Sequence, residues 1–149
     1  MSEAPDTRSG QCMCGAVRFV AKEVPKTISA CHCQMCRRWT GSALLEVSVP
    51  EDAVTWEGVE HIATRQSTPW AERAWCRECG SGVYFRMTAE NEFSGTLDIP
   101  LGIFDDPNGF EMTHEIFIDH KPDSFAYAGE RRQLTRADCV AKFDRLDSV

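Results

Sequence analysis

The sequence predicts a mostly β protein built from short antiparallel strands, and three observations carry this prediction. Short segments rich in Val, Ile, Phe and Trp recur along the chain, and Gly, Pro, Asn and Asp separate them at hairpin spacing. Only two segments have the periodicity of a helix. The length of 149 residues fits one domain with a sizeable core. We expect a single domain over 1–149, with a loose polar tail at 1–9.

The expected strands follow one another from the N-terminus. "MCGAVRFVAKE" (13–23) alternates in polarity until Pro25 ends it, and "ALLEVSVP" (43–50) ends at its own proline. "HEIFIDH" (114–120) alternates with Ile116 and Ile118 on one face, and it is the last strand we expect. The remaining expected strands are TISACHC (27–33), AVTWEG (53–58), EHIATRQ (60–66), RAWC (73–76), GVYFRM (82–87) and GTLDIP (95–100).

Two segments are expected to be helical. Residues 34–40 fit one short helix, directly after a group of cysteines. "LTRADCVAKFDRL" (134–146) places Leu134, Ala137, Val140 and Ala141 at helical spacing, and Thr135 is a candidate N-cap. We therefore expect a short C-terminal helix beside the strands.

The charge and the termini exclude several classes of function. The net charge is −7, whereas nucleic-acid binding requires a basic face, so we expect no nucleic-acid partner. We see no apolar signal segment at the N-terminus and no run long enough to span a membrane, and we expect a cytoplasmic protein. In a reducing compartment, eight cysteines are better explained by metal binding than by disulfides.

Seven of the cysteines form three groups, and the residue after each group suggests how they combine. A glycine follows "CMC" and "CREC", whereas Arg37 follows "CHCQMC". Glycine makes the tight backbone of a metal-binding turn accessible, and alternate residues of a strand share one face. The first and third groups therefore predict one closed, structural zinc site with four thiolates: Cys12, Cys14, Cys76 and Cys79.

The remaining group, Cys31, Cys33 and Cys36, supplies three ligands. Three protein ligands and one exchangeable position are typical of a catalytic zinc site. Three thiolates leave a local charge near −1 around Zn²⁺, which suits the capture of another soft ligand better than the generation of hydroxide. We expect this site to receive the thiol of a substrate.

Several neighbouring residues have more than one interpretation. His32 is either a fourth ligand or, as its place in an extended segment favours, a residue that points away from the cysteines. Arg37 and Arg38 either receive a carboxylate or form a solvated pair. Cys139 is interpreted as a packing residue of the C-terminal helix. By residue type alone, the candidates for proton transfer are Glu46, Asp98 and His114.

The order of these motifs resembles one known family. "GQCMCGAVRF", "CHCQMCRRWTGS", "WCRECGSGVYF", "SGTLD" and "HEIFIDHKPDSF" stand in the order typical of the glutathione-dependent formaldehyde-activating enzyme family, over about residues 10–127. The resemblance implies an Mss4-like fold and two zinc ions per chain. The structural zinc would be bound by Cys12, Cys14, Cys76 and Cys79, and the catalytic zinc by Cys31, Cys33 and Cys36.

The resemblance also implies an activity. The named reaction of the family joins glutathione and formaldehyde into S-(hydroxymethyl)glutathione, and the enzymes are classed as carbon–sulfur lyases. Two positions depart from the family pattern: Ser124, which is followed by Phe125, stands where Trp is frequent, and Trp75 stands where Phe is usual. The alternative is a non-catalytic, zinc-stabilised binding module of the same fold.

Overall fold

The structure is a computed structural model that describes residues 6–142, and these residues form two compact units. Unit one contains residues 6–26 and 47–110, and unit two contains residues 27–46 and 111–142. Strand β4 (Leu44–Pro50) contributes to both units. The described residues form eleven strands and two α-helices, which confirms the expected mostly β class. The single domain over 1–149 and the Mss4-like assignment stay predictions.

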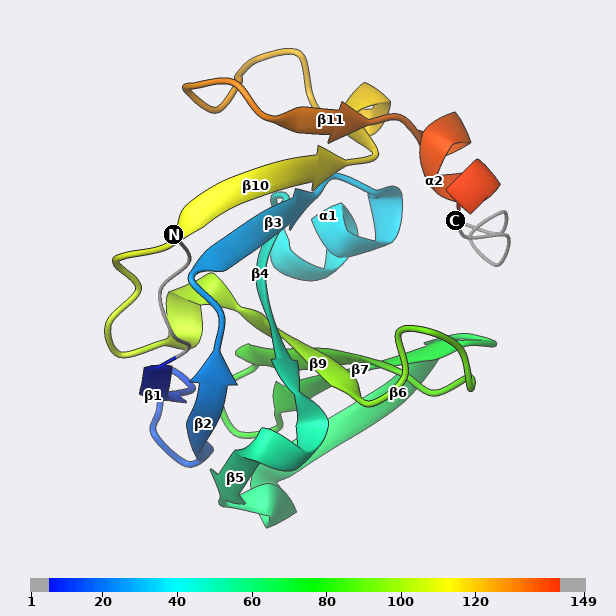
Figure 1. The fold of residues 1–149 in the computed structure, drawn as a ribbon. Helices are drawn as coiled ribbons and strands as arrows, with labels where there is room; N and C mark the ends of the chain where they lie inside the picture. Colours follow the sequence, from blue (N-terminus) through cyan, green and yellow to red (C-terminus); the bar gives the residue numbers. More distant parts are fainter. Residues whose placement is uncertain (1–5, 143–149) are drawn as a thin grey trace. The chain divides into compact units, whose positions relative to one another are not determined.

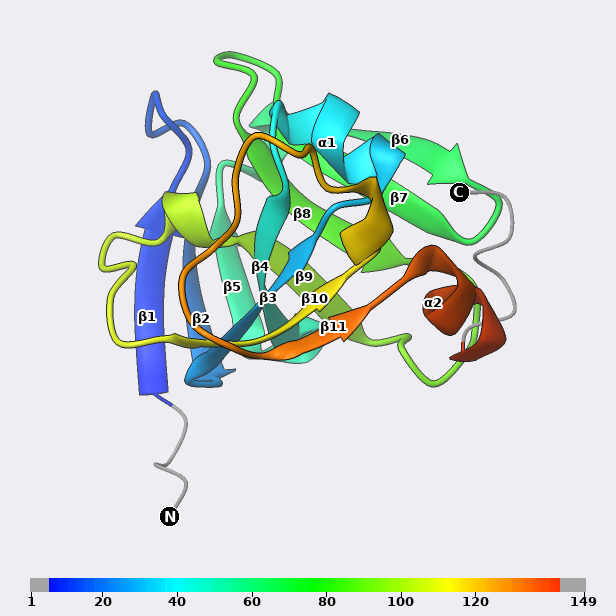
Figure 2. The same cartoon turned by 90° about the horizontal axis from the view of Figure 1, so that it is seen from above.

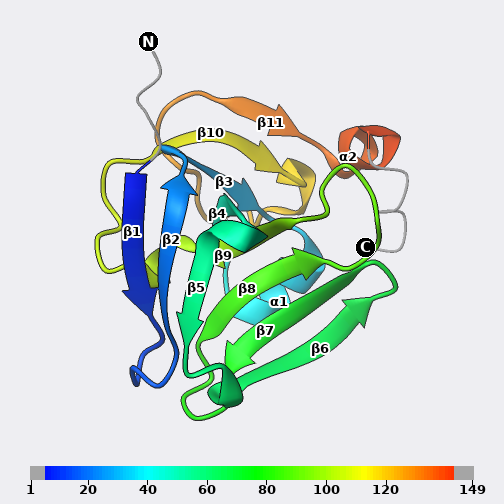
Figure 3. The same ribbon diagram turned by 60° about the horizontal axis from the view of Figure 1, so that its bottom comes forward.

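Unit one contains an antiparallel sheet of three strands, in the order β1 (Asp6–Gln11), β2 (Arg18–Val24) and β5 (Val54–Glu57), visible in Figure 3. Strand β2 alternates as its sequence predicts, because Phe19 and Ala21 are buried while their neighbours are exposed. The ring of Phe19 packs against Trp56 and Phe104 with centroid distances of 5.4 and 5.2 Å.

The other strands of unit one continue from the C-terminal half of β4 in the order β9, β8, β7 and β6, and the last three pairings are antiparallel. Short 3₁₀ helices occupy three of the connections in this unit. The bounds are β6 (Ile62–Thr68), β7 (Ala71–Cys76), β8 (Gly82–Met87), β9 (Thr96–Pro100), η1 (Glu51–Ala53), η2 (Val59–His61) and η3 (Leu101–Ile103).

Unit two is built on parallel pairing. Strand β10 (Glu111–Ile116) lies between β3 (Thr27–Cys31) and β11 (Arg132–Leu134) and is parallel to both, as Figures 1 and 2 show. The N-terminal half of β4 pairs with β3 in the antiparallel sense. The expectation of antiparallel strands alone is therefore wrong for this unit, because β3 and β10 are far apart in the sequence and no hairpin joins them.

Three local expectations are corrected. The tail expected at 1–9 is in part a strand, because β1 begins at Asp6 and pairs with β2; residues 1–5 lie outside the described residues. The strand expected at 114–120 ends at Ile116, because Phe117 has a φ of 55° and the 3₁₀ helix η4 (Ile118–His120) follows. Its buried face carries Glu115 and Phe117 rather than the two isoleucines.

Both expected helices are present. Helix α1 (Gln34–Thr40) ends at Gly41, whose φ of 84° favours glycine. Helix α2 (Arg136–Lys142) begins with the predicted cap: the Asp138 N–H donates to the Thr135 hydroxyl oxygen at 3.1 Å, and the Thr135 N–H donates to the Asp138 carboxylate at 2.9 Å. The end expected for this helix lies outside the described residues. No helix within residues 6–142 is long and apolar enough to cross a membrane.

Candidate metal centres

The four-cysteine cluster of unit one consists of Cys12, Cys14, Cys76 and Cys79. All four Sγ atoms lie within 4.8 Å of one another. The Sγ of Cys14 lies 3.6 Å from that of Cys12 and 3.8 Å from that of Cys76. A tetrahedral zinc with Zn–S bonds of 2.3 Å has S–S edges of about 3.8 Å, so the spacing fits this ion.

Two tight turns bring these thiols together. The N–H of Gly15 donates to the carbonyl of Cys12 at 3.2 Å, and the N–H of Gly80 donates to the carbonyl of Cys76 at 2.8 Å. Both glycines have a positive φ, of 81° and 84°. The glycine that follows each pair of cysteines therefore has the conformational role that the sequence predicts.

Polar groups around the four-cysteine cluster favour thiolates. The hydroxyl of Ser81 lies 3.3 Å from the Sγ of Cys79, and hydrogen bonds, of which this one has the largest effect, lower the pKa of Cys79 to about 6. The backbone N–H of Ala16 acts to lower the pKa of Cys14, but burial and the neighbouring thiols outweigh it and raise this pKa to about 12. The backbone N–H of Val17 donates to the Sγ of Cys12 at 3.3 Å. Donors aimed at sulfur are typical of thiolate sites that hold a metal.

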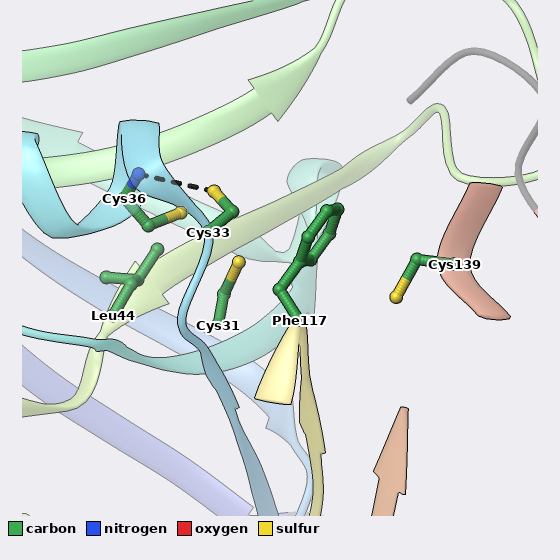
Figure 4. Close-up of a cluster of buried hydrophobic side chains, with 6 residues drawn as sticks. All are labelled: Cys31, Cys33, Cys36, Leu44, Phe117 and Cys139. Carbon is green, nitrogen blue, oxygen red and sulfur yellow. Dashed lines mark hydrogen bonds between the residues drawn. The ribbon is translucent and has the colours of Figure 1, made fainter. Parts of the chain in front are cut away.

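The three-cysteine cluster of unit two consists of Cys31, Cys33 and Cys36, and all three residues are buried. Their Sγ atoms also lie within 4.8 Å of one another. Cys31 ends β3, and Cys33 caps α1 by accepting the backbone N–H of Cys36 at 3.3 Å. A strand end, a cap and a helical turn therefore direct three side chains of one short segment toward a common space (Figure 4).

Three crowded thiols do not ionise together without a cation. The contacts with Cys33 and Cys36, and then burial, raise the pKa of Cys31 well above the usual value of a thiol. A metal ion reverses this balance, because its charge stabilises thiolates. The donor set is therefore compatible with zinc, and both clusters could hold a metal ion.

His32 lies between two of these cysteines but is not part of their cluster. Its Nε2 lies 2.8 Å from a carboxylate oxygen of Glu115, and both side chains are buried. The other carboxylate oxygen accepts from Arg131 at 3.0 Å and from Gln133 at 3.1 Å. The imidazole therefore points away from the thiols, as its place in an extended segment predicts.

Phe117 borders the three-cysteine cluster. Its ring stands beside Cys31 in Figure 4, and Cys139 lies beyond it in the same view. Phe117 is 2% exposed and its φ of 55° is rare for a bulky residue. Such strain persists only where surrounding contacts enforce it, and it concentrates at functional sites. Cys139 is fully buried in the same cluster of side chains, as expected of a packing residue.

The residues considered for proton transfer belong to neither cysteine cluster. Each instead has a hydroxyl neighbour: Glu46 accepts from Ser29 at 3.1 Å, Asp98 accepts from Ser48 at 2.5 Å, and the Nδ1 of His114 lies 3.0 Å from the hydroxyl of Thr113. Arg37 and Arg38 lie in the last turn of α1, where cations complement the helix dipole.

Glu115, Arg131 and Gln133 were not among the residues predicted from the sequence. A signal for Glu115 was present, because Glu115 and Phe117 are two residues apart in a strand and share one face. If that face is buried, a carboxylate on it requires a cation or several donors. No comparable pattern in the sequence indicates Arg131. This residue lies at the end of the loop between η4 and β11, and only the path of that loop brings it to Glu115.

The described strands carry two cysteine clusters that could each hold a metal ion, so the fold and the site define a mostly β protein with two candidate metal centres. The model of the glutathione-dependent formaldehyde-activating enzyme family matches residues 7–120, and the chain belongs to this family. A Schizosaccharomyces pombe protein named an uncharacterized lyase is 28% identical over 85% of this chain and 89% of its own length.

One further relative agrees with this assignment, and one solved structure shares the fold. A Halomonas elongata protein, provisionally named a glutathione-dependent formaldehyde-activating enzyme, is 30% identical over 76% of both chains. The crystal structure of a Rhodobacter sphaeroides protein matches with a TM-score of 0.54 at 22% identity, and the match covers 67% of this chain and 90% of that one. This last likeness concerns the fold alone.

Proposed function

We propose that this protein is a zinc-dependent carbon–sulfur lyase that forms and cleaves the adduct of formaldehyde with a thiol such as glutathione. One observation carries the proposal. Three buried thiols of one short segment converge, and His32, which lies between two of them in the sequence, is hydrogen-bonded to Glu115 instead. A tetrahedral ion held by Cys31, Cys33 and Cys36 keeps one position for a ligand from solution.

The reaction balances without an added oxidant or reductant. The thiol sulfur forms a bond to the formaldehyde carbon, and the proton lost from sulfur ends on the former carbonyl oxygen. Cleavage of the adduct is the reverse. Zinc bound at the three-cysteine cluster would supply a Lewis acid that favours the thiolate form of the substrate near neutral pH.

The protein side chains have separate tasks in this proposal. Cys31, Cys33 and Cys36 would hold the catalytic zinc. Cys12, Cys14, Cys76 and Cys79 bind a second, structural zinc that stabilises unit one. The names of the family and of the Halomonas relative support glutathione as the thiol. We place the protein in the cytoplasm, where free thiols persist.

Cobalt substitution tests the proposal directly, because thiolate-to-cobalt bands report the ligands of each cluster. The wild-type protein and a Cys33→Ser, Cys36→Ser double variant are compared, with zinc content measured on both. We expect two zinc ions per chain in the wild type and one in the variant, with the fold retained. Glutathione should change the cobalt bands of the wild type and leave those of the variant unchanged.

Turnover is measured by the exchange of ¹³C-formaldehyde with its glutathione adduct in NMR spectra. Wild-type protein should accelerate this exchange, and the double variant should not. Bands that do not respond to glutathione, together with exchange at the uncatalysed rate, would instead favour a non-catalytic binding module. Loss of both zinc ions with unfolding of the variant would contradict the division into a structural and an open site.

A further inference from the structure

We infer that Glu115 is a positioning residue of the three-cysteine cluster: through His32 it fixes the segment that carries Cys31 and Cys33. The inference rests on the proposed function only in assuming that this cluster holds a metal. Glu115 itself contacts none of the three thiols among the interactions described, so it acts through the residue between them.

His32 is held by strand β10 at two points. Its backbone N–H donates to the carbonyl of Ile116 at 3.1 Å, and its Nε2 lies 2.8 Å from the carboxylate of Glu115. Cys31 is aligned with Ile116 in the parallel pairing of β3 and β10. Consecutive residues of one strand therefore fix both the backbone and the side chain of His32. Because Cys31 and Cys33 are its neighbours in the chain, these contacts also restrict the backbone that carries the two thiols.

Glu115 is suited to this role because its side-chain hydrogen bonds join two segments that are far apart in the sequence. One carboxylate oxygen is hydrogen-bonded to His32, and the other accepts from Arg131 and from Gln133 of β11. The side chain of Glu115 is 2% exposed and that of Arg131 is 9% exposed, so the pair is shielded from water. A buried carboxylate with three donors and a compensating cation is stable as an anion.

An aromatic face covers the other side of the imidazole. The ring of Tyr127 stacks on His32 with a centroid distance of 5.9 Å and an interplanar angle of 30°. The segment that carries Tyr127 ends at Arg131, which is bonded to Glu115 and to the carbonyl of Ala128. The carboxylate thus also secures the segment that packs against His32. Together these contacts leave the ring one orientation.

Metal release tests this inference without any measurement of activity. Zinc-loaded full-length protein is mixed with an excess of a chelating dye, and the release phase of the three-cysteine cluster is identified as the phase that a Cys36→Ser variant lacks. In Glu115→Ala we expect this phase to be about 10- to 100-fold faster, the range typical of lost partners of metal-binding residues. The phase of the four-cysteine cluster should be unchanged and reports that unit one is folded.

Two further variants separate positioning from general structure. Glu115→Gln keeps an oxygen for Arg131 and Gln133 and offers an N–H to the other tautomer of His32, so its release rate should stay close to that of wild type. Glu111→Ala removes an exposed carboxylate from the same strand and should also release zinc at the wild-type rate. Circular dichroism of each variant checks its folding.

Several results would contradict the positioning role of Glu115. Equal release from Glu115→Ala and Glu111→Ala, slower release from Glu115→Ala, or a common loss of both phases overturns the inference. An imidazole ligand in the cobalt spectrum of the wild type overturns it as well, since His32 would then have left Glu115. A wild-type cluster that binds no metal overturns the proposed function too, whereas a metal-bound but inactive wild type removes the lyase assignment alone.

Discussion

The two cysteine clusters differ most in how far apart their ligands lie along the chain. In the four-cysteine cluster, Cys14 and Cys76 are 62 residues apart, and each pair sits on its own turn. In the three-cysteine cluster, all ligands come from residues 31–36. A metal that joins distant turns closes a long loop and stabilises the fold, whereas a metal held by one short segment contributes much less to chain closure. In the proposed function, this separation is what distinguishes the structural site from the site that is free to bind a substrate.

The surroundings differ in the same sense. The four-cysteine cluster relies on backbone N–H groups and Ser81, which are local to its turns. The three-cysteine cluster depends on residues of β10 and beyond, namely Glu115, Phe117 and Arg131. The donors to the thiols of the first site thus come from its own turns, whereas the contacts around the second site come from distant residues of unit two.

The largest effect is expected when one cysteine of each cluster is replaced. Cys76→Ser should lose the structural zinc and destabilise the protein by an amount on the order of 10 kcal/mol, enough to unfold unit one. Cys36→Ser should lose one zinc and keep its cooperative thermal transition. Zinc content and thermal denaturation, measured on both variants, check the pair. Equal destabilisation would show that ligand separation does not govern the role of a site.

A smaller effect is expected at the strained residue beside the three-cysteine cluster. Phe117→Ala should destabilise the protein by about 3–5 kcal/mol, because it empties a buried site. Phe117→Gly should be no less stable than Phe117→Ala, although glycine normally costs about 0.5–1 kcal/mol relative to alanine, because glycine tolerates the φ of 55°. Urea unfolding measures both variants. A glycine variant clearly less stable than the alanine variant would argue against backbone strain here.

Acid should destabilise unit two through the protonation of Glu115. Burial alone would raise the pKa of Glu115, but the hydrogen bonds from His32, Gln133 and Arg131 outweigh it and lower the pKa. A lowered pKa in the folded state stabilises the protein above the unfolded value of about 4.3, and this contribution disappears as the pH falls through the folded pKa. Below about pH 4, wild type should therefore lose stability faster than Glu115→Gln.

Urea midpoints of both proteins between pH 7 and pH 3 measure this difference. Parallel pH profiles for the two proteins would mean that Glu115 does not contribute in this way. The comparison of the two proteins cancels the loss of metal that acid causes in both.

The smallest expected effect concerns the cap of α2. Thr135→Ala removes the hydroxyl that accepts from the Asp138 N–H and should cost about 1 kcal/mol. Since Cys139 of this helix packs beside the three-cysteine cluster without belonging to it, the cobalt spectrum should not change. Urea unfolding measures the loss of stability, and cobalt absorption shows whether the metal ligands change. An altered spectrum would indicate that Cys139 takes part in metal binding.

Local patterns account for what the sequence could predict. The turn glycines after Cys14 and Cys79, the helix after Cys33 and the cap at Thr135 depend on residues close in sequence, and the structure agrees with each. The grouping of cysteines followed from the same local reasoning, and the four and three thiols that it joined do lie together.

Long-range pairing accounts for what was missed. Whether β10 pairs in parallel with β3, and which of its faces is buried, depends on segments that no local pattern relates. The alternation of "HEIFIDH" fits two registers, and a shift of one residue exchanges the isoleucine face for the one with Glu115 and Phe117. The network around His32 could not be predicted for the same reason.

The parallel pairing of β3 with β10 also sets an order of events during synthesis. His32 and Glu115 are 83 residues apart, and at about 5–20 residues per second a ribosome needs about 4–17 s to add that length. During this interval the thiols of residues 31–36 lack the strand that orients them. In a cell, the nascent chain would therefore carry three thiols for several seconds before β10 is made, and the orientation of these thiols would await the synthesis of that strand.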